Sequence, residues 1–188
     1  MRALAIGLRM SRIGRRRMKK IMFACALSAA LASPLIAEDN TLVRFDGGIG
    51  VIPVSNVTVV NGVTTVNRNV VRGINSPGQI WVIRRLRADI DVDGRIKASG
   101  RGLLLGGGNG IGTNAGQSVL ATLICDTAGT QLFTTTTPVP LAANGDFDID
   151  DMLTPAPLAC ASPVLLIRNG TGTVWFAAGI LKLNPDRD

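Results

Sequence analysis

Side chains that favour helices are almost missing after position 37. In residues 38–188, Glu occurs once, Lys twice and Met once, whereas Val, Ile and Thr are abundant. Glu, Lys and Met are strong helix formers, and β-branched residues suit the pleated surface of a sheet. This composition therefore predicts an all-β fold.

Apolar and β-branched runs, separated by Gly, Pro and Asn, predict about ten short strands. Outside the two hairpins described below, the expected strands are 42–45, 49–54, 69–72, 80–84, 119–125, 131–136, 147–149, 164–168 and 174–181. This pattern is typical of an antiparallel β-sandwich, with a small β-barrel as the alternative. The length suffices for one hydrophobic core, so we expect residues 38–188 to form a single all-β domain.

The first hairpin is predicted over residues 57–66. Asn61 and Gly62 stand between two β-branched runs, which is the strongest short-range signal for a two-residue hairpin loop. The predicted pairs are Thr58 with Thr65 and Val60 with Val63.

A second hairpin is predicted over residues 88–99. A two-residue loop at Asp93-Gly94 would place Ile90 opposite Lys97 and so mix the two faces of the strands. A type I turn with Gly94 in the left-handed conformation keeps every pair on a matching face. The resulting pairs are Ala88 with Ala98, Asp89 with Lys97, Ile90 with Ile96 and Asp91 with Arg95.

The net charge of the chain comes from its first 37 residues. The whole chain has a formal net charge of +7, which in a folded domain would indicate a nucleic-acid partner. Residues 1–37 hold eight basic residues and no acidic ones. The rest of the chain has no basic excess, so no nucleic-acid partner is expected.

These 37 residues have the features of a secretory signal peptide. The basic stretch RRRMKK precedes an apolar run, 21–31, that is too short to span a membrane. Small residues allow cleavage after Ala37 or, alternatively, after Ala32. We expect a secreted or periplasmic bacterial protein, exported by the general or the twin-arginine route. Charged and glycine residues interrupt the apolar stretch 163–183, so no membrane span is expected after signal removal.

Two cysteines, Cys125 and Cys160, remain after the signal peptide. An even pair in an exported chain predicts a disulfide. A reactive thiol is the alternative, but neither cysteine has a neighbouring His or Lys to lower its pKa.

Two acidic motifs are candidate calcium ligands. Asp146, Asp148 and Asp150 alternate with apolar residues, so their side chains should share one exposed strand face, and the neighbouring sequence offers no basic residue to relieve their repulsion. Clustered carboxylate oxygens suit Ca²⁺. A solvated strand face is the alternative interpretation.

The second motif consists of Asp89, Asp91 and Asp93, followed by Gly94. Its spacing matches the opening of an EF-hand calcium loop, but the twelfth position is Gly100 instead of Glu and no flanking helices are predicted. The hairpin register supplies the alternative, in which the first two carboxylates pair with basic residues across the strands.

A glycine-rich stretch, residues 106–116, contains the spacing of a dinucleotide-binding fingerprint. The following residues, QSVLATLIC, read as a strand, whereas the fingerprint requires a helix. We therefore expect a long loop between strands, which is a plausible place for binding. Trp81 and Trp175 are expected in the core.

The chain contains no His, which removes every catalytic triad, Cys-His pair and imidazole metal site. We therefore expect a non-catalytic exported module that binds a partner or has a structural role, without a cofactor. The first alternative is a calcium-dependent adhesion or carbohydrate-binding module. The second is a hydrolase that uses two Asp side chains. An extracellular protein or a glycan is the expected class of ligand.

Overall fold

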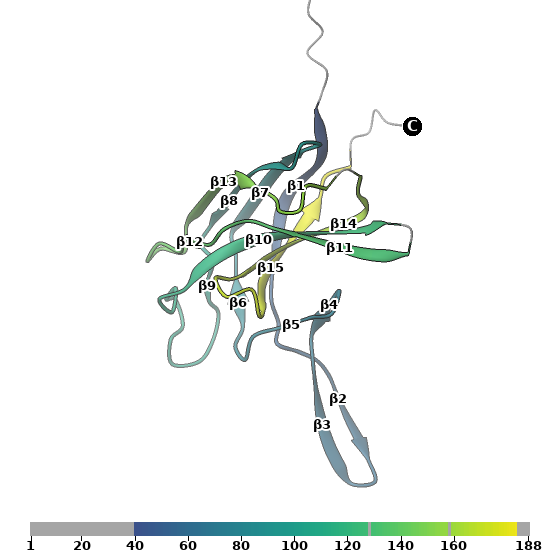
Figure 1. Ribbon diagram of the computed structural model, residues 1–188. Coiled ribbons are helices and arrows are strands. Elements are labelled where there is room, and N and C mark those ends of the chain that lie inside the picture. The colour runs from purple at the N-terminus through teal and green to yellow at the C-terminus, as the bar shows by residue number, and fades with distance from the viewer. Residues whose placement is uncertain (1–39, 128, 158, 184–188) are drawn as a thin grey trace, which may run out of the picture. The chain divides into compact units, whose positions relative to one another are not determined.

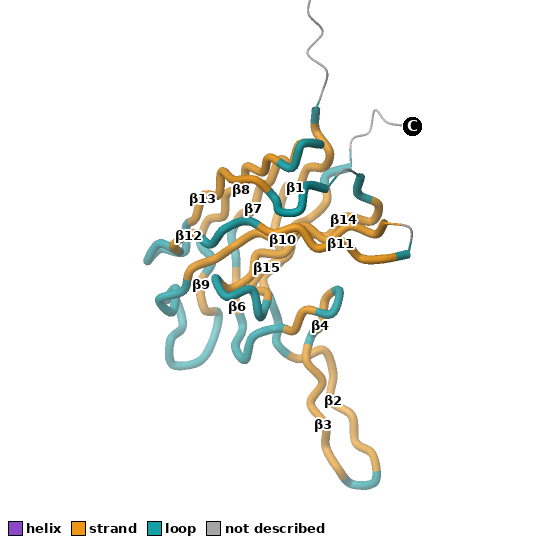
Figure 2. The backbone as a smooth tube through the Cα atoms, viewed as in Figure 1, coloured by secondary structure: helices purple, strands orange, loops and turns teal. Residues whose placement is uncertain are grey.

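The computed structural model describes residues 40–127, 129–157 and 159–183, which belong to one compact unit, residues 38–188 (Figure 1). The described residues form strands and turns and contain no helix (Figure 2), so the all-β prediction is confirmed. No helix among them could cross a membrane. The predicted signal peptide and both of its cleavage points lie outside the described residues.

The described residues form fifteen strands, nine of which build one antiparallel sheet. The large sheet contains β1 (Thr41–Gly50), β7 (Arg85–Asp91), β8 (Arg95–Arg101), β10 (Ser118–Thr127), β11 (Thr130–Thr135), β12 (Val139–Pro140), β13 (Phe147–Met152), β14 (Ala161–Asn169) and β15 (Trp175–Leu181). Three small pairs join β2 (Val54–Val60) to β3 (Val63–Arg68), β4 (Val70–Val71) to β5 (Ile74–Asn75), and β6 (Trp81–Val82) to β9 (Leu104–Leu105).

The large sheet curls into a half-barrel, whereas the sequence predicted a β-sandwich or, alternatively, a small β-barrel (Figure 1). Its strand order is β11-β10-β14-β15-β1-β7-β8-β13, and β12 pairs with β10. One isolated bridge links Thr135, at the end of β11, to Thr154, which follows β13, through backbone hydrogen bonds of 3.0 and 3.1 Å. In β1, the register shifts between Phe45 and Gly48, and such a bulge bends a strand.

The concave side of the sheet holds the core. Strand β7 alternates exposed and buried residues, with Leu86, Ala88 and Ile90 buried, as expected for a sheet with one solvated face. Trp81 stacks on Phe176 with ring centroids 4.0 Å apart. Both tryptophans lie in the core.

Both predicted hairpin registers are confirmed. Strands β2 and β3 pair Thr58 with Thr65 and Val60 with Val63. The intervening residues, Asn61 and Gly62, have φ values of 52° and 78°, which define a type I′ turn.

In the second hairpin, β7 and β8 pair Ile90 with Ile96 and Asp89 with Lys97. The N–H of Gly94 donates to the carbonyl of Asp91 at 3.0 Å, and Gly94 has a φ of 91°. This is the predicted type I turn with a left-handed glycine.

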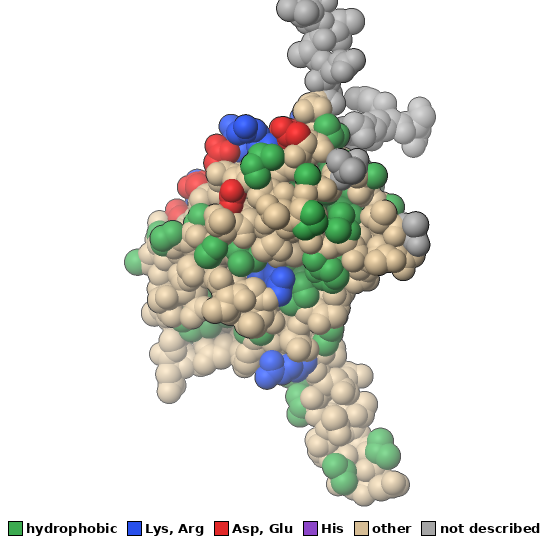
Figure 3. Space-filling model, in the orientation of Figure 1, with side chains coloured by type: hydrophobic (Ala, Val, Ile, Leu, Met, Phe, Trp, Pro, Cys, Tyr) green, Lys and Arg blue, Asp and Glu red, His purple; other side chains and the backbone are tan. Residues whose placement is uncertain are grey.

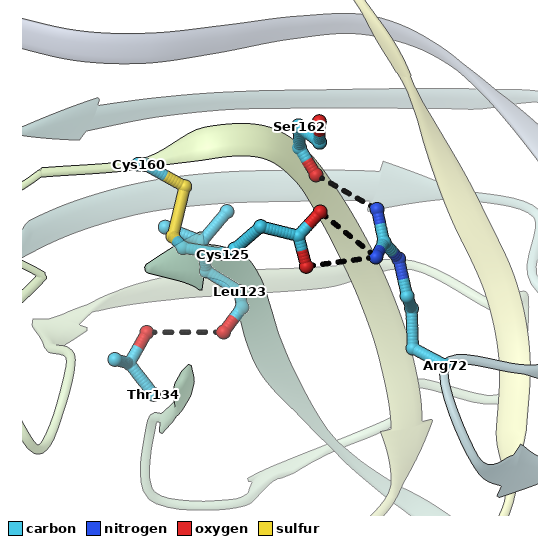
Figure 4. Close-up of a disulfide and its surroundings, with 7 residues drawn as sticks. Arg72, Leu123, Cys125, Thr134, Cys160 and Ser162 are labelled. Carbon is cyan, nitrogen blue, oxygen red and sulfur yellow. Dashed lines mark hydrogen bonds and ion pairs between the residues drawn. A yellow bond between two sulfur atoms is a disulfide. The ribbon is translucent and has the colours of Figure 1, made fainter. Parts of the chain in front are cut away.

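The predicted disulfide between Cys125 and Cys160 is also confirmed (Figure 4). Cys125 lies near the end of β10 and is fully buried, and Cys160 directly precedes β14. The bond therefore fixes the start of β14 beside the end of its sheet neighbour β10.

Candidate functional site

The convex face of the sheet carries opposite charges in alternation on β1, β7, β8 and β13, which we call the charged face (Figure 3). It comprises Arg44, Asp46, Arg87, Asp89, Arg95, Lys97, Arg101, Asp148 and Asp150. Arg44 pairs with Asp89 at 3.0 Å. The alternation of β strands places these side chains on one side because the residues between them are buried.

Three of the predicted calcium ligands meet on this face. Asp89, Asp148 and Asp150 line one groove of about 360 Å³, together with Arg87 and Lys97. The groove thus brings Asp89, from the second acidic motif, close to Asp148 and Asp150, from the first.

The remaining carboxylates have local structural roles or lie apart. Asp146 accepts hydrogen bonds from the N–H of Gly102 and from the amide of Asn144, each at 3.0 Å. Asp93 accepts from the N–H of Arg95 within the hairpin turn. Asp91 belongs to β7 but does not line the groove.

The expectation that no basic residue relieves the repulsion within the first motif is wrong. Strand β13 pairs with β8, which comes about fifty residues earlier and carries three basic side chains. Arg101 lies 2.9 Å from Asp148, and Lys97 lies 3.8 Å from Asp150. A cation bound here would therefore compete with existing ion pairs.

No group of three or more carboxylate, His or Cys side chains that could hold a metal ion occurs in the part of the chain that the structure describes. Asp89 lies opposite Lys97 in the β7–β8 pair, as predicted. Its carboxylate, however, forms an ion pair with Arg44 on β1.

Two carboxyl groups among the described residues, those of Asp46 and Asp151, have a pKa below the usual value. A hydrogen bond from Arg87 lowers the pKa of Asp46. Hydrogen bonds from the hydroxyl and the N–H of Thr137, both 2.7 Å, lower the pKa of Asp151. Hydrolysis by a carboxyl pair needs an acid with a raised pKa, so these two groups do not support it.

The glycine-rich stretch forms a loop between β9 and β10. A strand follows it, as predicted, and not the helix that a dinucleotide-binding fingerprint requires. Beside the loop lies a cavity of about 270 Å³ lined by Trp81, Phe176 and Asn169, among others. Asn169 uses its side-chain oxygen to accept from the N–H groups of Thr173 and Val174. With buried rings and an already bonded amide, the cavity offers few groups to a ligand.

The feature most suggestive of binding is the hairpin of β2 and β3, which projects from the half-barrel (Figure 1). Every residue of β2 is exposed. No charged residue occurs in segments 49–67, 73–83 and 102–125; the exposed Arg68, at the end of β3, is the charged residue of the hairpin itself. Ten of the aliphatic side chains that these segments expose, 40–66% each, form what we call the apolar end: Ile52, Val54, Val57, Val59, Val60, Val63, Val66, Ile80, Val82 and Ile111.

A shallow groove connects the hairpin base to the glycine-rich loop. It has a volume of about 280 Å³ and is lined by Pro53, Ile80 and Gly108, among others. The N–H of Asn69 donates to the carbonyl of Pro53 at 2.8 Å and fixes the exit of the hairpin beside its entry. Sequence reasoning found the hairpin but not its exposure; the uncharged run 49–67 was the available signal.

Comparisons of this chain with models of protein families, with curated proteins and with solved structures find no match.

Proposed function

We propose that this chain is an exported, non-catalytic β module that binds a protein partner through the apolar end. The observation that carries the proposal is the exposure of the β2–β3 hairpin, whose five valines from Val57 to Val66 stand 57–66% open to solvent. Export is supported by the signal-peptide features of residues 1–37.

A free hairpin of this kind has a physical reason to bind. Two strands alone are marginally stable in water, and their outer edges carry unpaired backbone groups that attract another strand. Contiguous exposed aliphatic surface is rare on soluble monomers and marks interaction sites. A protein partner would satisfy both the edges and the valines.

A non-catalytic role is supported by the composition and by the charged face. The chain has no His, and Asp148 and Asp46 are held in close ion pairs. We also propose that the half-barrel works as β-sandwich and small-barrel modules do, as a rigid scaffold that presents hairpins and loops to a partner.

The proposal is tested by placing a photo-crosslinking amino acid at Val59 in cells that make the protein. Val92, an apolar residue in the β7–β8 turn that is 40% exposed, is the matched control position. We expect a covalent protein adduct from position 59 and none from position 92. Equal yields, or no adduct at either position, would contradict binding through the apolar end.

Export is tested separately by the mass of the protein recovered from the periplasm or the medium. Cleavage after Ala37 with the disulfide formed predicts the mass of residues 38–188 less two hydrogens. A mass that includes residues 18–37 would contradict it.

A further inference from the structure

We infer that the partner of the apolar end is a second copy of this chain, with β2 of one copy lying antiparallel to β2 of the other. This inference rests on the proposed function and names its partner. It follows from the hairpin register, from the position of the exposed valines and from the surface available.

The hairpin register decides which backbone groups of β2 are free. A two-residue type I′ turn closes on a hydrogen-bonded pair, here Val60 and Val63, and hydrogen-bonded and non-hydrogen-bonded pairs then alternate. Val57 and Val59 belong to non-hydrogen-bonded pairs. Their N–H and C=O groups therefore point outward, away from β3.

These outward groups allow pairing about a two-fold axis. With the axis at Thr58, Val57 of one copy lies opposite Val59 of the other, and the reverse pair forms on the other side of the axis. The two hairpins become one four-stranded sheet. Val57, Val59 and Val66 lie on the same face of the hairpin, so the sheet gains a continuous aliphatic face.

The same pairing brings the hairpin tip of each copy to the base of the other. Strand β2 has seven residues and spans about 23 Å. In the antiparallel register, Gly62 of one copy reaches the level of Val54 of the other. The tip valines, Val60 and Val63, then approach the exposed Ile52 and the groove beside Ile80.

The apolar surface that this end offers is comparable in size to the apolar part of a standard dimer interface. Complete burial of one Val or Ile side chain removes roughly 60–120 Å² of apolar surface, so ten side chains at the observed exposure of 40–66% present roughly 350–700 Å². A standard interface covers about 800 Å² per partner, of which about 65%, or roughly 500 Å², is apolar in homodimers.

The chemistry of the surface favours a copy of this chain over a lipid surface. The ten side chains are all Val or Ile, whereas segments that insert into membranes carry aromatic and basic residues. Depletion of charge is typical of homodimer interfaces. A two-fold pairing also covers the same open edge of β2 on both copies, while the outer edges of β3 stay open.

The test is sedimentation velocity of the full purified chain over a concentration series from about 1 to 100 μM, in the range where homodimers of this interface size form. The unaltered protein should form a reversible dimer. The variant with Val57→Lys and Val59→Lys places like charges opposite each other twice and should raise the dimer dissociation constant by roughly 30-fold or more.

A charge-swapped variant separates the proposed register from general loss of apolar surface. Val57→Glu with Val59→Lys places Glu opposite Lys at both positions, so dimerisation should recover by at least about 5-fold relative to the double-lysine variant. Val92→Lys, in the β7–β8 turn, is the matched control and should leave the dimer unchanged.

Either of two results would overturn the inference: a monomer at every concentration, or a dimer that tolerates the two lysines. A monomer that still gives a crosslinked adduct of a different protein at position 59 would retain the proposed function and reject the second copy as partner. A monomer without any adduct would reject both.

Discussion

The guanidinium of Arg72 donates through Nη1 to both carboxylate oxygens of Asp126, at 2.9 and 3.0 Å (Figure 4). Its Nη2 donates to the carbonyl of Ser162 at 3.2 Å. Arg72 lies in the turn between β4 and β5, directly after the projecting hairpin, while Asp126 and Ser162 belong to β10 and β14. One side chain therefore anchors the segment that follows the hairpin to the sheet, next to the disulfide.

Replacement of Arg72 with Asn should lower the free energy of unfolding by about 1–2 kcal/mol, because the ion pair and its hydrogen bonds are lost at a half-buried position. Arg72 has a φ of 50°, a conformation that Asn adopts more readily than Arg, so backbone strain does not add to the loss. Urea denaturation measures the change. Asp126→Asn should give a similar loss, and the two together less than the sum. Additive losses would contradict a direct pair.

Removal of the disulfide by the double variant Cys125→Ala and Cys160→Ala should lower the free energy of unfolding by about 3–4 kcal/mol, because the bond closes a loop with a sequence separation of 35. For a domain of this size, that corresponds to a fall in melting temperature of roughly 6–16 °C. Calorimetry measures it. A fall under about 2 °C would show that the bond adds little to stability.

Asp151 should make stability depend on pH. Its folded-state pKa is lowered by the hydrogen bonds from Thr137, so its stabilisation is present above the unfolded-state pKa of about 3.9 and is lost as the pH falls through the lowered folded-state value. Asp151→Asn should therefore be less stable than the unaltered protein at neutral pH, and the difference should disappear in acid.

Urea midpoints measured at several pH values between neutrality and strong acid test this. Asp150→Asn is the matched control, since Asp150 lies on the same strand with its nearest basic groups 3.8 and 3.9 Å away. A difference between Asp151→Asn and the unaltered protein that stays constant with pH would contradict the role of this carboxylate.

Calcium should have little effect on stability, because the carboxylates of the groove already have basic partners. In about 10 mM Ca²⁺ compared with EDTA, we expect the melting temperature to change by less than about 1 °C. A dissociation constant of about 1 mM would raise it by roughly 3 °C or more. Such a rise, abolished by Asp148→Asn, would favour the calcium-dependent adhesion or carbohydrate-binding alternative.

Local turn chemistry made both hairpins predictable down to their registers. Asn61 and Gly62 can adopt the two positive φ values of a type I′ turn, and the facing pattern around Gly94 leaves one consistent register. In β1, by contrast, the sequence predicted two strands, 42–45 and 49–54, with Gly47 and Gly48 between them. The structure instead accommodates them as a bulge within one strand.

Contacts between distant segments could not be predicted. Arg101 lies 47 residues before Asp148, and no local pattern indicates that β8 and β13 are neighbours. The exposure of the β2–β3 hairpin was missed for the same reason. Alternation in sequence shows which valines share a face, but whether another element covers that face depends on the whole topology.

The most direct test of the apolar end as a self-pairing surface is amide hydrogen exchange of the β2–β3 hairpin at low and high protein concentration. The outward N–H groups of Val57 and Val59 should become protected as the concentration rises. The N–H groups of Thr64 and Val66, on the outer edge of β3, should exchange at unchanged rates. Exchange at Val57 and Val59 that does not depend on concentration would contradict pairing through β2.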